Sequence, residues 1–377
     1  MYLDKYRLSS PTKIGVVGTG FISKGFCHFI ETQKDFHLTK ILTRRNIDTV
    51  EGFKYKAKLT NSLQDLLNQS EIVIELSGGL KYTSDNVAEA HKRELPVVTL
   101  NTDFQVTYGS RHVSTGFLTE AQGDQPGCMA ALNEEVISMG FEPMVYANIK
   151  GYLNHNPTTE DMLNWSAIQG ISLDQVTAAT DGTKLQSEMA FIANGLGATI
   201  AQKGLIGYTT NNLHEGAMYL AQEAENLGKP IADYLLSDPN AIAKLPKGIF
   251  IVAKHERYHQ PMLEYYKIGK WPYYIFHKPY YLPHLEIVKT LRSLVNRNIV
   301  PFNNGDVAHV IVTALTKKAL SKGEIIEKGI GSFQLRGEAV VKSEKKNSLE
   351  IGLVENLTIN RKLRYGESIR SDYCRQH

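Results

Sequence analysis

Residues 13–23 join a short apolar run, a glycine-rich turn and the start of a helical pattern, in the order KIGVVGTGFIS. A dinucleotide-binding strand–turn–helix unit requires this order. Gly18 permits the tight turn, Gly20 lets the backbone approach a pyrophosphate, and the small Ser23 stands where the usual pattern has a third glycine. Free N–H groups at the start of the helix would hold the pyrophosphate. These residues predict a Rossmann unit at the beginning of the chain.

Length and composition limit the class of protein. A chain of 377 residues is longer than a single hydrophobic core usually supports, so we expect two or three domains. A net charge of +3 is too small to predict a nucleic-acid or membrane partner. Residues Met1–Lys5 lack the apolar core of a signal peptide, and no run approaches a membrane span. The separated Cys27, Cys128 and Cys374 suit neither a disulfide framework nor a zinc cluster, which predicts a cytoplasmic protein.

Strand and helix patterns alternate from about residue 12 to residue 150. The expected strands are Lys13–Val17, Phe36–Leu42, Ile72–Leu76, Pro96–Leu100 and Glu142–Ile149. The expected helices are Phe21–Thr32, Leu63–Asn68, Ser84–Lys92 and Pro126–Met139. Ser62 is placed to cap the second of these helices, with Asp65 at the capping-box position. This alternation predicts a parallel sheet with helical crossovers.

The pattern changes after residue 150 and again after residue 304. The middle range contains an expected strand, three expected helices and an aromatic run: Gly248–Ala253; Thr183–Asn194, Gly216–Leu227 and Leu285–Val295; and Trp271–His277. The last helix could return to the first domain, and we interpret the aromatic run as a core strand rather than an oligomer interface. The expected short strands near the end are His309–Ala314, Gly329–Gln334, Glu338–Lys342 and Ser348–Leu353. The fold class is therefore α/β: a Rossmann domain (1–150), an α+β substrate and oligomerisation domain (151–304), and a small C-terminal all-β module (305–377).

The end of the second expected strand indicates which coenzyme is preferred. An NAD site places a carboxylate there for the ribose hydroxyls, whereas this chain has Thr43, Arg44 and Arg45. Two guanidinium groups suit an adenosine 2′-phosphate, although two solvated arginines remain the alternative. We therefore expect NADP(H) in preference to NAD(H). The residues expected to contact it are Gly18, Gly20, Phe21, Ile22, Thr43, Arg44, Arg45, Ser77, Gly78, Gly79 and Asn101.

Two segments offer side chains for acid–base chemistry. In a helix that starts at Thr183, Lys184 and Glu188 lie one turn apart on one face, and Asp181 lies at the helix start. The alternative is a capping aspartate and a surface ion pair. Lys150 ends the strand at 142–149 and could face the nicotinamide, or it could simply extend toward solvent. The catalytic candidates are therefore Lys184, Lys150, Asp181 and Glu188.

Two further motifs have weaker interpretations. Residues 123–126, GDQP, start a helix whose N–H groups could hold an anion, or Asp124 could cap it. His255-Glu256-Arg257-Tyr258-His259 matches the zinc-protease pattern, which needs a helix to bring both histidines to one metal. An apolar strand pattern precedes this motif and Pro261 follows it, so we do not expect zinc there.

In combination these segments resemble the homoserine-dehydrogenase-like oxidoreductases that carry a C-terminal SAF (antifreeze-like) domain. The resemblance is carried by the glycine turn and by residues 98–109 (VTLNTDFQVTYG), 123–126, 181–184, 272–276 and 351–355. The family includes a branch similar to 1-deoxy-D-xylulose 5-phosphate reductoisomerase, which uses NADPH, and reductases of sugar or polyol derivatives. Thr102 follows Asn101 where homoserine dehydrogenases have a lysine, which argues against that activity. The resemblance supports Lys150, Asp181 and Lys184 as site residues.

The sequence thus predicts an NADP(H)-dependent oxidoreductase that reduces a small polar carbonyl compound, such as a sugar or polyol derivative, phosphorylated or not. It is also compatible with a metal-assisted reductoisomerase of a ketose phosphate, in which Glu120, Asp124, Asp181 and Glu188 are the available carboxylates for a divalent ion. A homoserine dehydrogenase-like enzyme and a non-enzymatic nucleotide-binding scaffold stay open at this point. We expect a homo-oligomer with a small-molecule substrate.

Overall fold

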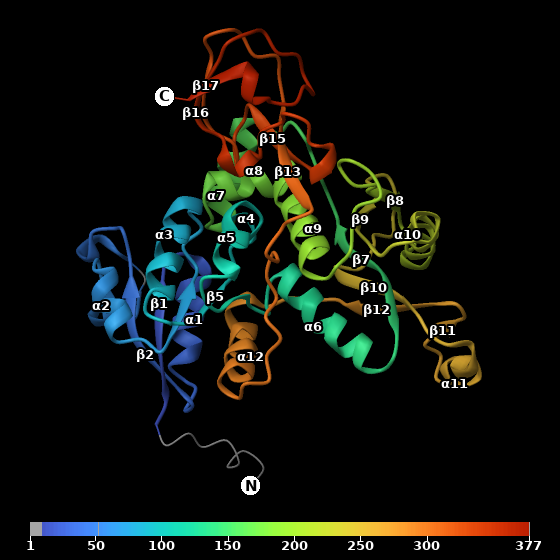
Figure 1. Ribbon diagram of the computed structural model, residues 1–377, viewed down its shortest axis with the longest axis horizontal. Helices are drawn as coiled ribbons and strands as arrows, with labels where there is room; N and C mark the ends of the chain where they lie inside the picture. Colours follow the sequence, from blue (N-terminus) through green and yellow to red (C-terminus); the bar gives the residue numbers. More distant parts are fainter. Residues whose placement is uncertain (1–9, 52, 377) are drawn as a thin grey trace. The chain divides into compact units, whose positions relative to one another are not determined.

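The computed structural model describes residues 10–51 and 53–376. The expectation about a signal peptide at Met1–Lys5 therefore concerns residues outside the described part. The chain divides into two compact units, and Figure 1 traces its helices and strands in colours that follow the sequence. The first contains the described residues up to Gly127 together with Leu282–Asp306, and the second contains Cys128–Tyr281 and the residues from Val307 onward. The division into domains at residues 150 and 304 stays a prediction.

A parallel six-stranded sheet forms the centre of the first unit, as a Rossmann domain requires. Its strands are β1 (Thr12–Val17), β2 (Phe36–Leu42), β3 (Leu59–Thr60), β4 (Ile72–Glu75), β5 (Val97–Thr99) and β6 (Leu118–Glu120). All neighbouring strands are parallel, and their spatial order is β3-β2-β1-β4-β5-β6. The chain therefore adds strands toward one edge of the sheet from β1 to β3 and toward the other edge from β4 to β6, so the order reverses between β1 and β4. In such a sheet ligands bind beyond the carboxyl ends of the strands at the reversal point. The α/β fold class is confirmed.

Helices cover this sheet in the first unit. They are α1 (Phe21–Ile30), α2 (Leu63–Asn68), α3 (Leu80–His91), α4 (Thr102–Phe104), α5 (Ser110–Val113) and α12 (Pro283–Val295), with short turns at Ile47–Thr49, Lys56–Lys58 and Gln105–Gly109. The predicted return of α12 is confirmed: Ile287 and Leu291 are fully buried in one core cluster with Ile14 and Phe26. Ser62 caps α2 as predicted, because its hydroxyl accepts the Asp65 N–H at 3.1 Å.

The prediction that Glu142–Ile149 is the last Rossmann strand is wrong. This segment is β7 (Glu142–Lys150), which pairs with β9 (Ile231–Ser237) and β10 (Gly248–Lys254) in a second sheet. The sixth Rossmann strand is instead β6, which has three residues and no apolar alternation. A strand pattern reports that a segment is extended but not which sheet it joins, so Lys150 belongs to the second unit.

The second unit is built on a mixed sheet in the order β11-β12-β10-β7-β9-β8. Its remaining strands are β8 (Tyr208–Thr210), β11 (Gly269–Lys270) and β12 (Tyr273–Lys278). Its helices are α7 (Thr159–Gln169), α8 (Leu173–Thr180), α9 (Thr183–Gly195), α10 (Leu213–Leu227) and α11 (Gln260–Tyr265), with a short turn at Arg257–His259. Helix α6 (Gln125–Ser138) contains the boundary between the two units. The aromatic run does form a strand, and Tyr274 in it is fully buried.

The C-terminal β segments also belong to the second unit. They comprise the antiparallel pair β13 (Val310–Thr316) and β15 (Leu335–Val341) and the sheet of β14 (Ile325–Lys328), β16 (Glu355–Ile359) and β17 (Cys374–Gln376), with turns at Lys342–Glu344, Ile351–Leu353 and Ser371–Tyr373. The predicted strand at Gly329–Gln334 is wrong, because Gly331 has a left-handed φ of 73° and the segment turns between β14 and β15. Residues 348–353 form isolated bridges and a turn instead of the predicted strand. The SAF-like identity of this module stays a prediction.

Within residues 10–51 and 53–376, no helix combines the length and the apolar character needed to cross a membrane.

Candidate functional site

The turn after β1 has the geometry that the glycine pattern predicts. Gly18 has a φ of 111°, and a Cβ there would lie 2.8 Å from the Leu76 carbonyl oxygen. A Cβ on Gly20, by contrast, would meet no atom of the described residues within 4 Å. Ser23 is fully buried and donates its hydroxyl to the Gly18 carbonyl at 2.7 Å, which ties α1 to the turn. The open space in front of Gly20, at the start of α1, fits a pyrophosphate held by backbone N–H groups.

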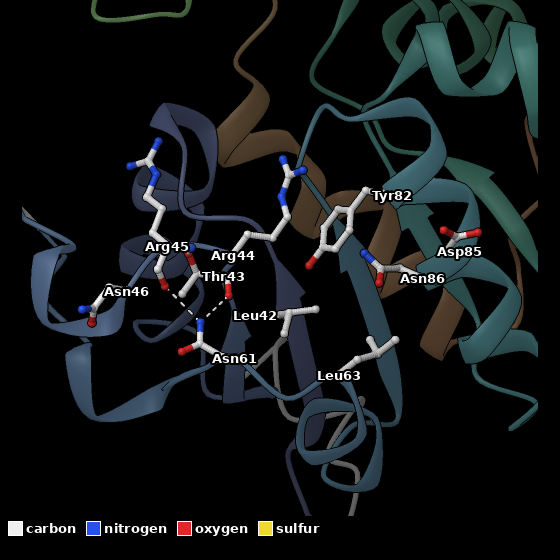
Figure 2. Close-up of a pocket in the computed structure, with 10 residues that line it drawn as sticks. All are labelled: Leu42, Thr43, Arg44, Arg45, Asn46, Asn61, Leu63, Tyr82, Asp85 and Asn86. Atoms are coloured by element: carbon white, nitrogen blue, oxygen red, sulfur yellow. Dashed lines mark hydrogen bonds between the residues drawn. The ribbon is translucent and has the colours of Figure 1, made fainter. Parts of the chain in front are cut away.

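A cavity of about 660 Å³ lies beside the end of β2 (Figure 2). It is lined by Leu42, Thr43, Arg44, Arg45, Asn46, Asn61, Leu63, Tyr82, Asp85 and Asn86. The Arg44 guanidinium lies 4.5 Å from the centre of the Tyr82 ring, and one of its nitrogens would lie 3.7 Å from a Cβ on Gly79. The loops after β2 and β4 therefore meet at Arg44. The lining includes one carboxylate, Asp85, which Figure 2 shows on the far side of Tyr82 from both arginines.

Asn61 fixes the loop that carries the two arginines. Its side-chain amide donates to the Thr43 carbonyl at 2.6 Å and to the Arg45 carbonyl at 3.0 Å (Figure 2). The Thr43 hydroxyl in turn accepts the Arg45 N–H at 3.2 Å and lies 3.1 Å from the Thr19 hydroxyl. The loop is thus held before any ligand binds, which lowers the entropic cost of recognising a phosphate there.

The loop after β4 is fixed by a buried carboxyl group. Glu75 is fully buried, and its Oε1 accepts the Ser77 N–H at 3.0 Å as well as the Ser77 hydroxyl. Among residues 10–51 and 53–376, no side chain or backbone group forms a hydrogen bond with its Oε2. Nearby, Asn101 donates to the Thr83 hydroxyl at 3.2 Å and caps α4 by accepting the Phe104 N–H. Burial raises the pKa of Glu75 to about 7, so about half of this carboxyl group is protonated at neutral pH and most of it is protonated in mildly acidic solution.

Replacing Glu75 by glutamine is expected to remove a pH dependence of stability. Burial raises the pKa of Glu75 from 4.5 to about 7, so the folded protein binds this proton more tightly than the unfolded chain. The stabilisation of the folded state by this proton is fully present below pH 4.5 and is lost as the pH rises through 7. The loss amounts to about 3 kcal/mol in the free energy of unfolding. Urea unfolding of both proteins between pH 5 and pH 8 measures it. The difference between Glu75→Gln and the unmodified protein should grow with pH, and a constant difference would contradict the assignment.

The second unit brings three of the four catalytic candidates together. Glu188 on α9 is fully buried, which excludes the alternative of a surface ion pair. Its Oε1 lies 3.5 Å from the Lys184 Nζ and its Oε2 lies 3.3 Å from the Lys150 Nζ. Asn148, which precedes Lys150 on β7, donates to Oε2 at 2.9 Å. Two ammonium groups share one carboxylate, so the cluster carries a formal charge of +1 and can stabilise a developing oxyanion.

Asp181, the fourth candidate, has different partners. Its Oδ2 accepts a hydrogen bond from the Lys317 Nζ at 2.7 Å, and its Oδ1 accepts the Thr183 N–H at 2.8 Å. The Asp181 and Lys317 side chains are 0% and 1% exposed. Burial raises the pKa of Asp181 and lowers the pKa of Lys317, which narrows the difference between their proton affinities. Asp181 thus caps the start of α9 and pairs with a lysine from the C-terminal strands.

The structure also places the two remaining motifs. Asp124 accepts the Gln125 N–H at 3.0 Å at the start of α6. His255 precedes the short turn Arg257–His259 and His259 ends it, so the two histidines do not lie on one helix, and a ring nitrogen of His255 lies 3.2 Å from the Met139 carbonyl oxygen. In the described part of the chain, no group of three or more His, Cys, Asp or Glu side chains could hold a metal ion. Glu188 and Asp181, each paired with lysine, do not fit a divalent-metal site as they are arranged.

Four functional candidates escaped the sequence analysis: Asn61, Glu75, Asn148 and Lys317. Glu75 lies two residues before Ser77, and a carboxylate at the end of the apolar strand β4 was a signal of burial. Asn148 and Lys150 are two residues apart on one strand and therefore share a face, which could have indicated their common partner. Nothing in the sequence distinguishes the buried Lys317 from its neighbour Lys318, whose side chain is 54% exposed.

Comparison with known proteins adds the class of enzyme. Residues 123–287 match the family model described as "Oxidoreductase DRL, catalytic domain". The chain is an oxidoreductase. This matched range contains Lys150, Asp181, Lys184 and Glu188. Nicotinamide coenzymes are among the hydride carriers of oxidoreductases, and the turn after β1 has the glycines of a dinucleotide-binding turn.

Solved structures and curated proteins were compared as well. The chain is similar to a homoserine dehydrogenase from Thiobacillus denitrificans, with 14% identity over 94% of this chain and 98% of that one and a TM-score of 0.46. A homoserine dehydrogenase from S. aureus gives 13% identity over 88% of this chain and 93% of that one, with a TM-score of 0.43. At these values neither likeness carries an argument about the reaction. No curated protein matches the sequence.

Proposed function

We propose that this oxidoreductase uses NADPH to reduce a small polar carbonyl compound, a sugar or polyol derivative. The observation that carries the proposal is the Lys150–Glu188–Lys184 cluster, in which two lysines converge on one fully buried carboxylate within the matched catalytic range. A carbonyl that accepts a hydride needs a positive group at its oxygen and a proton donor. The cluster supplies both.

The roles of the cluster residues follow from their exposure. Bound NADPH supplies the hydride. The Lys184 side chain is 39% exposed and the Lys150 side chain 19%, so Lys184 is the more accessible to a substrate oxygen. Lys184 polarises the carbonyl and donates the proton, and Lys150 adds positive charge beside it. Glu188, held by Asn148, keeps both ammonium groups in place.

The preference for NADPH over NADH rests on the loop after β2. Arg44 and Arg45 line the cavity there, and Asn61 holds their backbone. Guanidinium groups bind phosphate oxygens through charge-assisted forked hydrogen bonds. A cytoplasmic setting and a homo-oligomeric state, both expected from the sequence, stay predictions.

Calorimetry and NADPH oxidation assays on the unmodified protein and on a Gly20→Val variant test the proposal. The protein should bind NADPH with measurable heat and should oxidise it in the presence of a member of an aldose and ketose panel. Gly20→Val should weaken NADPH binding at least about tenfold, because the new side chain occupies the pyrophosphate space. The melting temperature should stay unchanged, since a Cβ at Gly20 meets no atom within 4 Å in the part of the chain that the structure describes, and its φ of −79° suits any residue.

Three outcomes would contradict the proposed carbonyl reduction, and two of them indicate a different function. An absence of binding heat with either coenzyme would overturn the enzymatic proposal. Binding without turnover across the panel would favour a nucleotide-binding scaffold instead. Turnover that is lost on adding EDTA and restored by a divalent cation would favour the reductoisomerase reaction, which needs a metal.

A further inference from the structure

Helix α9 carries Lys184 and Glu188, and the C-terminal strands hold this helix along its length (Figure 1). Three of its polar side chains bond to the backbone of β13 and β15. The bonds run from the Gly337 N–H to the Thr183 hydroxyl at 2.8 Å, from the Ala339 N–H to the Gln186 Oε1 at 2.8 Å, and from the Val310 N–H to the Asn194 Oδ1 at 2.9 Å. These contacts fix α9 against β13 and β15 from its first to its last turn.

A buried ion pair adds a charged contact just before the helix. Lys317 directly follows β13, and its ammonium group reaches Asp181 at 2.7 Å. The Lys317 side chain is 1% exposed, and its ammonium also lies 5.8 Å from the centre of the Phe333 ring. A lysine is almost never buried to this extent unless it is paired. The buried Lys317 ammonium group therefore requires the Asp181 carboxylate as its counter-charge, and Lys317 in turn neutralises the buried Asp181.

Asp181 determines where α9 begins. The N-cap residue, Gly182, is in the left-handed conformation with a φ of 88° and has no side chain to cap the helix. The Asp181 carboxylate takes this role, since its second oxygen accepts the Thr183 N–H. Lys184 is the next residue along the helix, so a shift of the first turn moves its ammonium group relative to Glu188.

We propose that Lys317 is a positioning residue of the reaction, which fixes the first turn of α9 through Asp181 and thereby places Lys184 against Glu188. This inference rests on the proposed function, in which Lys184 and Glu188 carry the chemistry. Because the Lys317 side chain is almost completely buried, it acts through Asp181 and not on the substrate. The C-terminal segment is then part of the catalytic machinery and not an appended module.

Substitution of Lys317 by methionine in the full chain is the first test. We expect kcat to fall at least about tenfold, since small displacements of a catalytic group carry penalties of this size or larger. The dissociation constant of NADPH should stay unchanged, because the coenzyme residues lie in the first unit. Lys318→Met is the matched control, because Lys318 is the next residue and its side chain is 54% exposed. This control variant should retain full kcat.

A double variant covers the case in which the buried, unpaired Asp181 prevents folding. Asp181→Asn combined with Lys317→Met removes both charges, and the asparagine can still accept the Thr183 N–H. If the pair positions Lys184, kcat should stay at least about tenfold low even when the melting temperature recovers. A double variant with the kcat of the unmodified protein would show that the pair only stabilises the fold and would overturn the proposal.

Hydrogen exchange separates this inference from the proposed function. The amides of Thr183–Glu188 should exchange faster in the double variant than in the unmodified protein, whether or not any substrate is turned over. Unchanged exchange there would overturn the role of Lys317. An absence of turnover by the unmodified protein, in contrast, would overturn the proposed function while the exchange result still decides whether Lys317 fixes the start of α9.

Discussion

Substitution of Lys184 by methionine is expected to lower kcat/KM for carbonyl reduction by about 10²- to 10⁴-fold, the range typical for loss of a positioned proton donor. Methionine keeps the length and apolar stem of lysine but has neither the positive charge nor the proton. Glu188 would retain Lys150 at 3.3 Å and Asn148 at 2.9 Å, so the buried carboxylate would not be left unpaired. The defect should therefore be catalytic and not one of folding.

Steady-state NADPH oxidation with the carbonyl compound that the unmodified protein reduces measures this effect, and calorimetry checks that coenzyme binding persists. Lys229→Met is the control, because Lys229 is exposed after α10 and lies outside the cluster. A Lys184→Met enzyme with kcat/KM within about threefold of the unmodified protein would remove Lys184 as the proton donor. If Lys150→Met alone caused the large loss, the two lysines would have the opposite roles.

The second large effect concerns the choice of coenzyme. Arg44→Asp is expected to weaken NADPH binding about 100-fold, since a charge-assisted phosphate contact is lost and a like charge is introduced. NADH binding should change much less, because a carboxylate at the end of β2 is the group that accepts the ribose hydroxyls in NAD sites. The ratio of the two dissociation constants should therefore reverse or nearly do so.

Isothermal titration of both coenzymes, at one fixed salt concentration, measures that ratio. Arg111→Asp provides a matched control: Arg111 also lies over a tyrosine ring, 5.0 Å from the centre of Tyr108, but does not line the cavity beside β2. An equal loss of NADPH and NADH affinity in Arg44→Asp would refute the 2′-phosphate assignment. It would indicate instead that the contact of Arg44 with Tyr82 serves the adenosine that both coenzymes share.

Many turns, caps and helices of both units could be predicted because their signals are local. A left-handed turn at Gly18 needs glycine whatever surrounds it, and a serine cap such as Ser62 needs only the next helical turn. The helices α1, α2, α9 and α10 were predicted to within a few residues for the same reason. Predictions failed where a strand was short or where its partner was distant, as for β6 and for the segments after β13.

The sequence alone determined the glycine turn, the arginines after β2 and the helical spacing of Lys184 and Glu188, because each depends on neighbouring residues and on backbone geometry. The tertiary structure decided that β7 joins the second sheet, that Glu188 is buried between two lysines, and that Lys317 pairs with Asp181 while Lys318 is exposed. Burial and ion pairing are sums over contacts that are distant in sequence, so no local pattern specifies them.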